Sequence, residues 1–210
     1  MGIWKWKWAQ QLEWRWWRRY LGSKNRADYL SWKKAYWLRL WNDLSLTIPD
    51  HASILDAGCG PAGIHLIFPI NKTWAIDPLL PEYQEHGLLF SVGYAEYLPV
   101  GLEEFQLKDP VDWIFCMNVL NHTCEPEVSM QNMYRHLRPG GRLILAVDTH
   151  RYDFVKYLFR LIPADMLHPH QWSSEDYRKL LLRCGLRIEQ EKVEKQGIIF
   201  NYQLWVAVKP

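Results

Sequence analysis

The chain has 210 residues, of which 49% are hydrophobic and 23% are charged, and its formal net charge is +2. This length suits one full-sized domain with an appendage and hardly two domains, and the composition is typical of a soluble globular protein. No apolar run approaches the roughly 18–20 residues that span a bilayer, and we expect no secretory signal because the N-terminus lacks an uninterrupted apolar core.

The cysteines bear on the cellular compartment. The four cysteines form no C-x-x-C pair and are well separated along the chain. This spacing argues against a zinc site and a disulfide framework, so we expect no bound metal and a reducing, cytoplasmic location. The residues are Cys59, Cys116, Cys124 and Cys184.

The first 50 residues differ from the rest. Nine of the 13 tryptophans lie in the first 41 residues, and residues 1–50 carry ten Lys or Arg against four Asp or Glu. Two helices are predicted, over residues 2–21 and 27–44, although the alternation in IWKWKW leaves an extended first turn open. Their apolar stripes are Trp4, Trp8 and Leu12, then Trp14, Trp17 and Leu21, and in the second helix Tyr29, Trp32, Tyr36, Trp37 and Leu40.

From residue 53 onward short apolar runs alternate with helical stretches. This pattern predicts a doubly wound α/β fold with a mainly parallel sheet, preceded by the helical cap at residues 1–50. The last two runs follow each other directly, so we expect an antiparallel hairpin at one edge. The predicted strands are SILDAG, TWAIDP, LLFSVG, VDWIFCMN, RLILAVD, LRIEQEKV and IIFNYQLWVAVK.

Helix signals are also clear in this region. Pro126 suits a first helical position, and the Pro-Gly-Gly sequence at 139–141 stops that helix. Ser173 and Asp176 form a capping-box pattern, and Gly185 suits the position just past the end of the helix that they begin.

The most informative stretch is ILDAGCGPAG at residues 54–63. Its three glycines also match a dinucleotide fingerprint, so the acids decide between cofactors. Asp56 would lie close to a bound pyrophosphate, which is unfavourable, whereas the ammonium and sulfonium of S-adenosylmethionine would favour it. Asp77 ends the next strand, where a carboxylate can accept both ribose hydroxyls. An NAD-dependent oxidoreductase and a glycine turn without a ligand remain the alternatives.

Four ordered segments resemble the class I S-adenosylmethionine-dependent methyltransferases. The segments are ILDAGCGPAG, WAIDP, GYAEYLP, and VDWIFCMNVLNHT followed by LRPGGRLIL. The resemblance covers residues 50–210 and implies a seven-stranded sheet in which the last strand is inserted antiparallel. It also implies S-adenosylmethionine as the cofactor and S-adenosylhomocysteine as the product.

The resemblance also implies a set of cofactor contacts. Asp56, Gly58 and Gly60 would line the methionine portion, and Asp77 would bind the ribose. Two departures from the family pattern are Tyr94, which replaces a common acid, and Pro69, which shortens the helix after the glycine loop. The remaining implied contacts are Ala95 and Glu96 at the adenine, and Asn118, Val119 and Leu120 at the sulfonium.

Candidate general bases follow the fourth and fifth predicted strands. An oxygen acceptor usually needs a base, whereas a neutral amine or a thiolate does not. His122, Asp148 and His150 are the candidates, each weighed against a purely structural role. His168 and His170 follow, but their spacing matches no defensible metal site.

Three roles are open for the cap. It forms a lid that builds the acceptor pocket, lies peripherally on a membrane through residues 1–21, or binds nucleic acid, and dimerisation through it also stays open. We expect a small-molecule or lipid-like acceptor and not nucleic acid, because the sheet domain is net acidic. The rival class is a non-catalytic interaction protein that docks through the Trp-rich helices.

Overall fold

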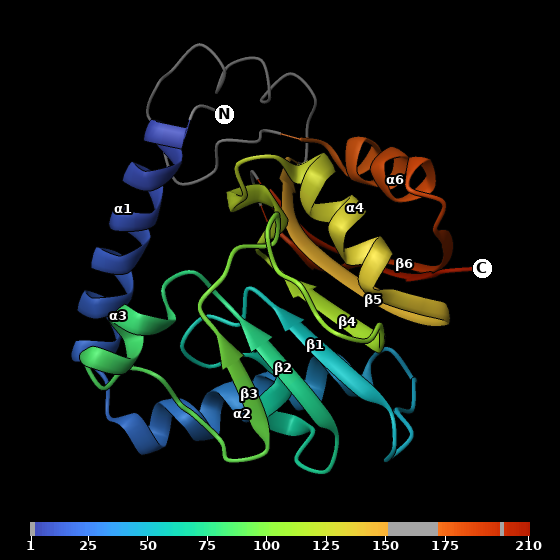
Figure 1. Cartoon of the computed structure of the whole chain (residues 1–210). Coiled ribbons are helices and arrows are strands. Elements are labelled where there is room, and N and C mark those ends of the chain that lie inside the picture. The colour runs from blue at the N-terminus through green and yellow to red at the C-terminus, as the bar shows by residue number, and fades with distance from the viewer. Residues whose placement is uncertain (1–2, 151–171, 198–199) are drawn as a thin grey trace.

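The computed structural model describes residues 3–150, 172–197 and 200–210, and Figure 1 shows their arrangement. A seven-stranded sheet in the order β3-β2-β1-β4-β5-β7-β6 forms its centre. Six strands are parallel, and β7 runs antiparallel to both β5 and β6. The strands are β1 Ser53–Ala57, β2 Lys72–Ile76, β3 Ala95–Leu98, β4 Val111–Met117, β5 Leu137–His150, β6 Arg187–Gln196 and β7 Phe200–Val208. The predicted fold class, the edge hairpin and the inserted antiparallel strand are confirmed.

The helices cover both faces of the sheet. Alternate residues of the central strands point to opposite faces, and both sets are buried, as expected for parallel strands between helical layers. Ile54 and Phe115 pack with α2, whereas Leu55 and Ile114 pack with α4 and α6. The helices are α1 Ile3–Gly22, α2 Arg26–Asn42, α3 Leu80–Glu85, α4 Pro126–His136 and α6 Ser174–Arg183, with short 3₁₀ turns η1 Ile64–Ile67 and η2 Leu120–His122.

The predicted strand LLFSVG is wrong. Residues 88–93 form a loop, and the strand beside β2 begins two residues later, at Ala95. The run is apolar because Leu88, Leu89 and Phe90 pack against the cap and the glycine-loop region instead of pairing with a strand. Arg26 of α2 fixes this loop by donating hydrogen bonds to the carbonyls of Gly87 and Leu89.

The stripes predicted for the cap are only partly correct. In α1, Trp14 and Trp17 are partly buried and Leu21 is buried, but Trp8 is 48% exposed. In α2, Trp37 and Leu40 are buried, whereas Trp32 on the same predicted stripe is 55% exposed. Asn25 caps α2 by accepting hydrogen bonds from the N–H groups of residues 27 and 28. No helix within the described ranges is long and apolar enough to cross a membrane.

The capping box predicted before α6 is confirmed. The Ser173 hydroxyl accepts the Asp176 N–H at 3.3 Å, and the Asp176 carboxylate accepts the Ser173 N–H at 2.9 Å. We predict that Ser173→Ala lowers the free energy of unfolding by about 1 kcal/mol, because it removes the hydroxyl that accepts the Asp176 N–H at the start of α6. Urea denaturation measures this change, and Ser174→Ala is the matched control. Equal stability of the two variants would contradict the role of the cap.

Candidate functional site

The glycine loop after β1 needs glycine at two positions for different reasons. Gly58 has a φ of +75°, and a Cβ there would collide with the side chain of Val119 at the end of β4. A Cβ on Gly63 would overlap the Asp56 carboxylate and the His65 ring. The loop therefore brings its backbone close to two neighbouring strand ends, as a ligand-binding turn requires.

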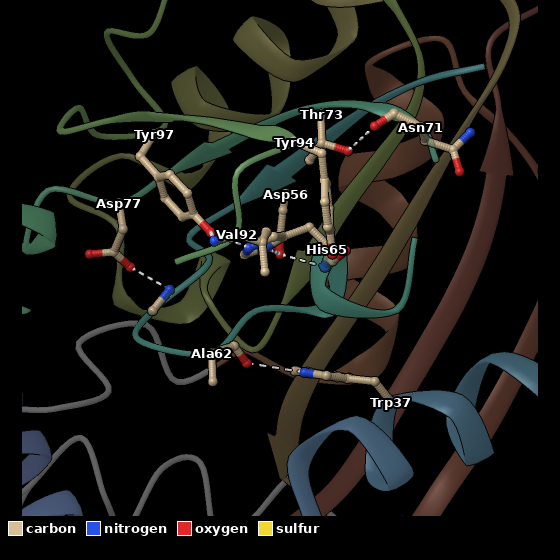
Figure 2. A network of polar contacts seen from close by, with 11 residues as sticks. Trp37, Asp56, Ala62, His65, Asn71, Thr73, Asp77, Val92, Tyr94 and Tyr97 are labelled. Carbon is tan, nitrogen blue, oxygen red and sulfur yellow. Dashed lines mark hydrogen bonds and ion pairs between the residues drawn. The ribbon is translucent and has the colours of Figure 1, made fainter. Parts of the chain in front are cut away.

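Asp56 is held by a chain of polar groups that Figure 2 shows. Its Oδ2 accepts the backbone N–H of His65 at 3.0 Å and lies 2.7 Å from His65 Nδ1. His65 Nε2 lies 2.9 Å from the hydroxyl of Tyr97, which in turn accepts the Val92 N–H. Every partner is satisfied when Nδ1–H donates to Asp56 and the Tyr97 hydroxyl donates to Nε2. The network fixes the carboxylate and leaves its Oδ1 for a ligand.

Asp77 occupies the matching position at the end of β2. Its Oδ2 accepts the Gly60 N–H and its Oδ1 accepts the Leu79 N–H, each at 2.9 Å. The carboxylate is 7% exposed, and burial raises its pKa to about 6 although the two N–H donors oppose the shift. Because each carboxylate oxygen has a second lone pair, both oxygens can still accept a ligand hydroxyl.

One cavity of about 960 Å³ lies over the carboxyl ends of the strands. This is where open α/β sheets bind ligands. Of the residues predicted from the sequence, those that line this cavity are Asp56, Gly58, Gly60, Asp77, Asn118, Val119, His122 and Asp148. Residues of three of the four motif segments, ILDAGCGPAG, WAIDP and VDWIFCMNVLNHT, therefore converge on one site although they are far apart in the sequence.

Other predicted residues are not brought to this cavity. Ala95 and Glu96 begin β3 and pair with the first half of β2, so they lie away from the carboxyl edge. Glu103, in the loop that follows β3, lines the cavity instead, together with its two preceding neighbours. Leu120 is fully buried in the core. His150 ends β5, but its side chain lies outside the described part of the structure, as do His168 and His170.

The cap forms the opposite wall of the cavity. Trp37 of α2 donates its indole N–H to the carbonyl of Ala62 at 3.1 Å, which ties the cap to the glycine loop (Figure 2). Trp17 and Glu13 of α1 and Lys33 of α2 also line the cavity. The sequence placed Trp17 and Trp37 on apolar helical stripes but identified neither Glu13 nor Lys33, because only the packing of the helices shows which polar side chains point inward.

Lys33 places a positive charge in this wall. Its ammonium lies 4.2 Å from the Trp37 ring centroid and, among the described residues, forms no ion pair. Burial lowers the pKa of Lys33 to about 8, although the charge of Asp56 opposes the shift. A partly desolvated cation without an acidic partner favours an anionic group of a ligand.

We predict that Lys33→Met weakens the binding of S-adenosylhomocysteine at least ~10-fold, a loss of about 1.4 kcal/mol, by removing the partner of its carboxylate. Methylthioadenosine lacks that carboxylate and should bind equally to both proteins. Titration calorimetry with the two ligands measures the difference, and Lys34→Met is the neighbouring control. An equal loss for both ligands would contradict a carboxylate contact.

Glu13 of α1 approaches Asp77 from the cap side. Burial, together with the nearby charge of Asp77, raises the pKa of Glu13 to about 7, although a hydrogen bond with Trp17 opposes the shift. Two buried acids with raised pKa values bind more protons in the folded state than in the unfolded state over this pH range. Folding stability therefore falls as pH rises from about 5 to 8.

We predict that the ligand-free protein has a lower free energy of unfolding at about pH 8 than at about pH 5.5. Glu13→Gln should flatten this pH dependence, because the amide cannot ionise. Urea denaturation at the two pH values measures both effects. A stability that rises with pH, or an unchanged slope in Glu13→Gln, would contradict the buried acid pair.

The far end of the cavity lies at the ends of β5, β6 and β7. Tyr202 of β7 lies directly between Asp148 of β5 and Lys195 of β6 in the strand register. Its hydroxyl forms a hydrogen bond with that of Tyr36 in α2, so cap and sheet also meet here. Burial raises the pKa of Tyr202, and the nearby Tyr36 and Asp148 raise it further. The backbone N–H of Asp148 donates to Asn118 Oδ1 at 3.2 Å, which connects this end with the glycine-loop end.

Comparison with known proteins identifies the family. A family described as a methyltransferase domain matches residues 29–191, which is most of the chain. The tRNA U34 carboxymethyltransferase of Idiomarina loihiensis is 32% identical over 102 residues, covering 44% of this chain and 31% of that enzyme. The ubiquinone biosynthesis O-methyltransferase of Rickettsia prowazekii is 26% identical over 181 residues, covering 77% of this chain and 65% of that enzyme.

These relatives bear on the acceptor. The chain spans about a third of the length of the tRNA enzymes that it matches. Because these relatives are named as tRNA enzymes, the comparisons do not support the expectation that nucleic acid is excluded as an acceptor. The relatives agree in group transfer and differ in the molecule that receives the group.

Solved structures share the fold. A S-adenosylmethionine-dependent methyltransferase from Methanosarcina mazei has a TM-score of 0.62 and 18% identity, covering 77% of this chain and 94% of that one. The N-methyltransferase NodS from Bradyrhizobium japonicum, solved with S-adenosylhomocysteine, has a TM-score of 0.57 and 17% identity, covering 76% and 78%. With the family match, the sheet order and the converging motif residues, these likenesses show that the chain belongs to the class I S-adenosylmethionine-dependent methyltransferases.

Proposed function

We propose that this enzyme methylates a small molecule that binds between the cap, residues 1–50, and the ends of β5, β6 and β7 in the domain formed by residues 51–210. The observation that carries the proposal is the cavity itself. At about 960 Å³ it lies near the upper limit of the range for small-molecule sites. It extends beyond the glycine loop and Asp77 to Asp148 and Tyr202, which leaves room for an acceptor beside the cofactor.

The two ends of the cavity suit the two reactants. In this proposal Asp56, Gly58, Gly60 and Asp77 hold the cofactor, and the sulfonium faces Asn118 and Val119. The acceptor then lies against the aromatic side chains of Tyr36 and Tyr202 at the far end. Aromatic walls exclude water and stack on planar or apolar acceptors, which agrees with a small-molecule or lipid-like substrate.

The transfer is an in-line displacement. Bound S-adenosylmethionine would supply the methyl group, with the C–S electron pair staying on sulfur to give S-adenosylhomocysteine, and a lone pair of the acceptor would form the new bond to carbon. Holding the two atoms in line supplies most of the acceleration. We propose Asp148 and His122 as the groups that take the proton of an oxygen acceptor, since both line the cavity. The role of His150 stays a proposal from its place at the end of β5.

Incubation of the full chain with methyl-labelled S-adenosylmethionine tests the proposal. The acceptor pools are a metabolite extract, an organic-phase lipid extract and total tRNA. We expect label in one of the first two pools and less label with Asp148→Asn. Label in tRNA alone would contradict the proposal and favour the second candidate, a tRNA nucleotide, which rests on the named tRNA relatives.

We propose peripheral membrane contact through the outer face of α1. Trp8 is 48% exposed there, and Arg15, Arg18 and Arg19 are exposed two to three turns further along the same helix. Tryptophan interleaved with arginine suits an anionic lipid surface. The protein should float with phosphatidylglycerol vesicles and not with phosphatidylcholine vesicles, and Arg15→Glu with Arg19→Glu should abolish flotation. Unchanged flotation, or binding to tRNA alone, would contradict membrane contact.

A further inference from the structure

We infer that the acceptor carries an anionic group, which Arg39 of α2 and Lys195 of β6 bind at the far end of the cavity. The inference rests on the proposed small-molecule site and names the chemical class of its substrate. Both side chains line the cavity, and they come from its two opposite walls, the cap and the sheet. In the described structure neither side chain forms an ion pair.

Two tyrosines, Tyr36 and Tyr202, lie between Arg39 and Lys195. Arg39 lies over the Tyr36 ring, 5.6 Å from its centroid, and Tyr36 forms a hydrogen bond with Tyr202. Tyr202 is the direct cross-strand partner of Lys195. Directly opposed residues of antiparallel strands place their side chains on the same face of the sheet. Arg39 and Lys195 therefore flank the two tyrosine hydroxyls, and the hydroxyl that accepts the bond within the pair keeps its own proton to donate to the same ligand.

The acidic residues at this end do not cancel the positive charge. Glu194 lines the cavity, but its carboxylate pairs with Lys192 at 3.2 Å. Asp148 is the other acid at this end and lies on the far side of Tyr202 from Lys195. Among the residues that the structure describes, two cations without ion-pair partners against one acid give the acceptor end a positive charge.

The arrangement fits an acceptor molecule that carries an acidic group at one position and the nucleophilic atom that receives the methyl group at another. Arg39 and Lys195 would hold a carboxylate or a phosphate group of the acceptor, with Arg39 suited to bind it in two places. Asp148 lies nearer to Asn118, and thus to the sulfonium side, because its N–H is bonded to that residue. It would accept the proton of the attacking hydroxyl or amine while the methyl group moves to the same atom.

Paired probes test this inference on the full chain loaded with S-adenosylhomocysteine. The probes are para-hydroxybenzoate and its uncharged analogue para-hydroxybenzamide, and the readout is titration calorimetry. We expect the acid to bind at least ~10-fold more tightly than the amide, which corresponds to about 1.4 kcal/mol. Arg39→Met and Lys195→Met should each lower this ratio several-fold, and the double variant should bind both probes equally.

The controls separate the inference from the proposed function. Both residues are exposed, so their substitution should leave the thermal midpoint and the affinity for S-adenosylhomocysteine unchanged. Lys34→Met, on the same helix but away from the cavity, should keep the preference for the acid. Equal binding of acid and amide by the unmodified protein would overturn the anionic assignment alone. Failure of both probes to bind would overturn the small-molecule acceptor site as well.

Discussion

Asp77→Ala should lower the affinity for S-adenosylhomocysteine at least ~100-fold, which corresponds to about 2.7 kcal/mol. The substitution removes the proposed ribose acceptor and also both bonds that shape the loop, to the Gly60 and Leu79 N–H groups. Hydrogen bonds to a charged group contribute about 1.5–3 kcal/mol each, so losing two roles at once gives a large effect. Titration calorimetry at constant pH measures the change.

Asp112→Ala is the matched control for this variant. Asp112 lies near the amino-terminal end of the central strand β4, away from the cavity, where its carboxylate accepts the Ser53 N–H at 2.8 Å. Its loss should lower stability without changing the affinity for the cofactor product. A folded Asp77→Ala protein that binds S-adenosylhomocysteine within threefold of the unmodified protein would contradict the assignment of the ribose site.

Gly63→Ala should lower the free energy of unfolding by about 3 kcal/mol or more, at the upper end of what overpacking usually costs. The new methyl group would overlap Asp56, His65 and Cys59, all of which are buried. Because the Asp56–His65 pair cannot move without losing the Tyr97 contact, the structure has no inexpensive way to relax.

Urea denaturation measures this loss, and Gly22→Ala is the control. A Cβ on Gly22 meets nothing within 4 Å. That substitution should be neutral or stabilising by up to about 1 kcal/mol, since alanine restricts the unfolded chain. If Gly63→Ala were as stable as Gly22→Ala, the close packing of the loop on Asp56 would be wrong.

The sequence predicted those strands of the sheet that have a clear local pattern of apolar residues. The runs that became β1, β2 and β4 are short, apolar and followed by turns or acids, so no other element competes for them. The run at residues 88–93 looks the same, but Phe90 packs with Tyr29 of the cap, at 5.5 Å between ring centroids. The strand that pairs with β2 is Ala95–Leu98, whose mixed polarity reflects an exposed edge position.

The site was predictable to a similar degree. Asp56, Gly58 and Gly60 lie in the segment ILDAGCGPAG and Asp77 lies in WAIDP, and the structure brings the two segments to one cavity. The residues that support them could not be predicted, because their partners are distant in sequence. Trp37 bonds to a carbonyl 25 residues away, and His65 meets Tyr97 across 32 residues. Such pairs depend on packing, which periodicity does not encode.

The lid interpretation of the cap gains support from these contacts. Trp17, Lys33 and Tyr36 line the cavity with the motif residues, and Trp37 ties α2 to the loop. Trp8 and Trp32, by contrast, face outward and leave a surface available for a partner. We propose that this one segment has two roles, with an inner face for the reactants and an outer face for a membrane.

A thermal-shift comparison of S-adenosylhomocysteine with NAD tests the central claim most directly. At about a hundred times its dissociation constant a ligand stabilises the folded state by about 2.7 kcal/mol. For a chain of this size that corresponds to a rise in Tm of roughly 5–10 °C. We expect this rise with S-adenosylhomocysteine and none with NAD. A rise with NAD, or no rise with S-adenosylhomocysteine, would contradict an adenosyl-cofactor site built from Asp56, Asp77 and the cap.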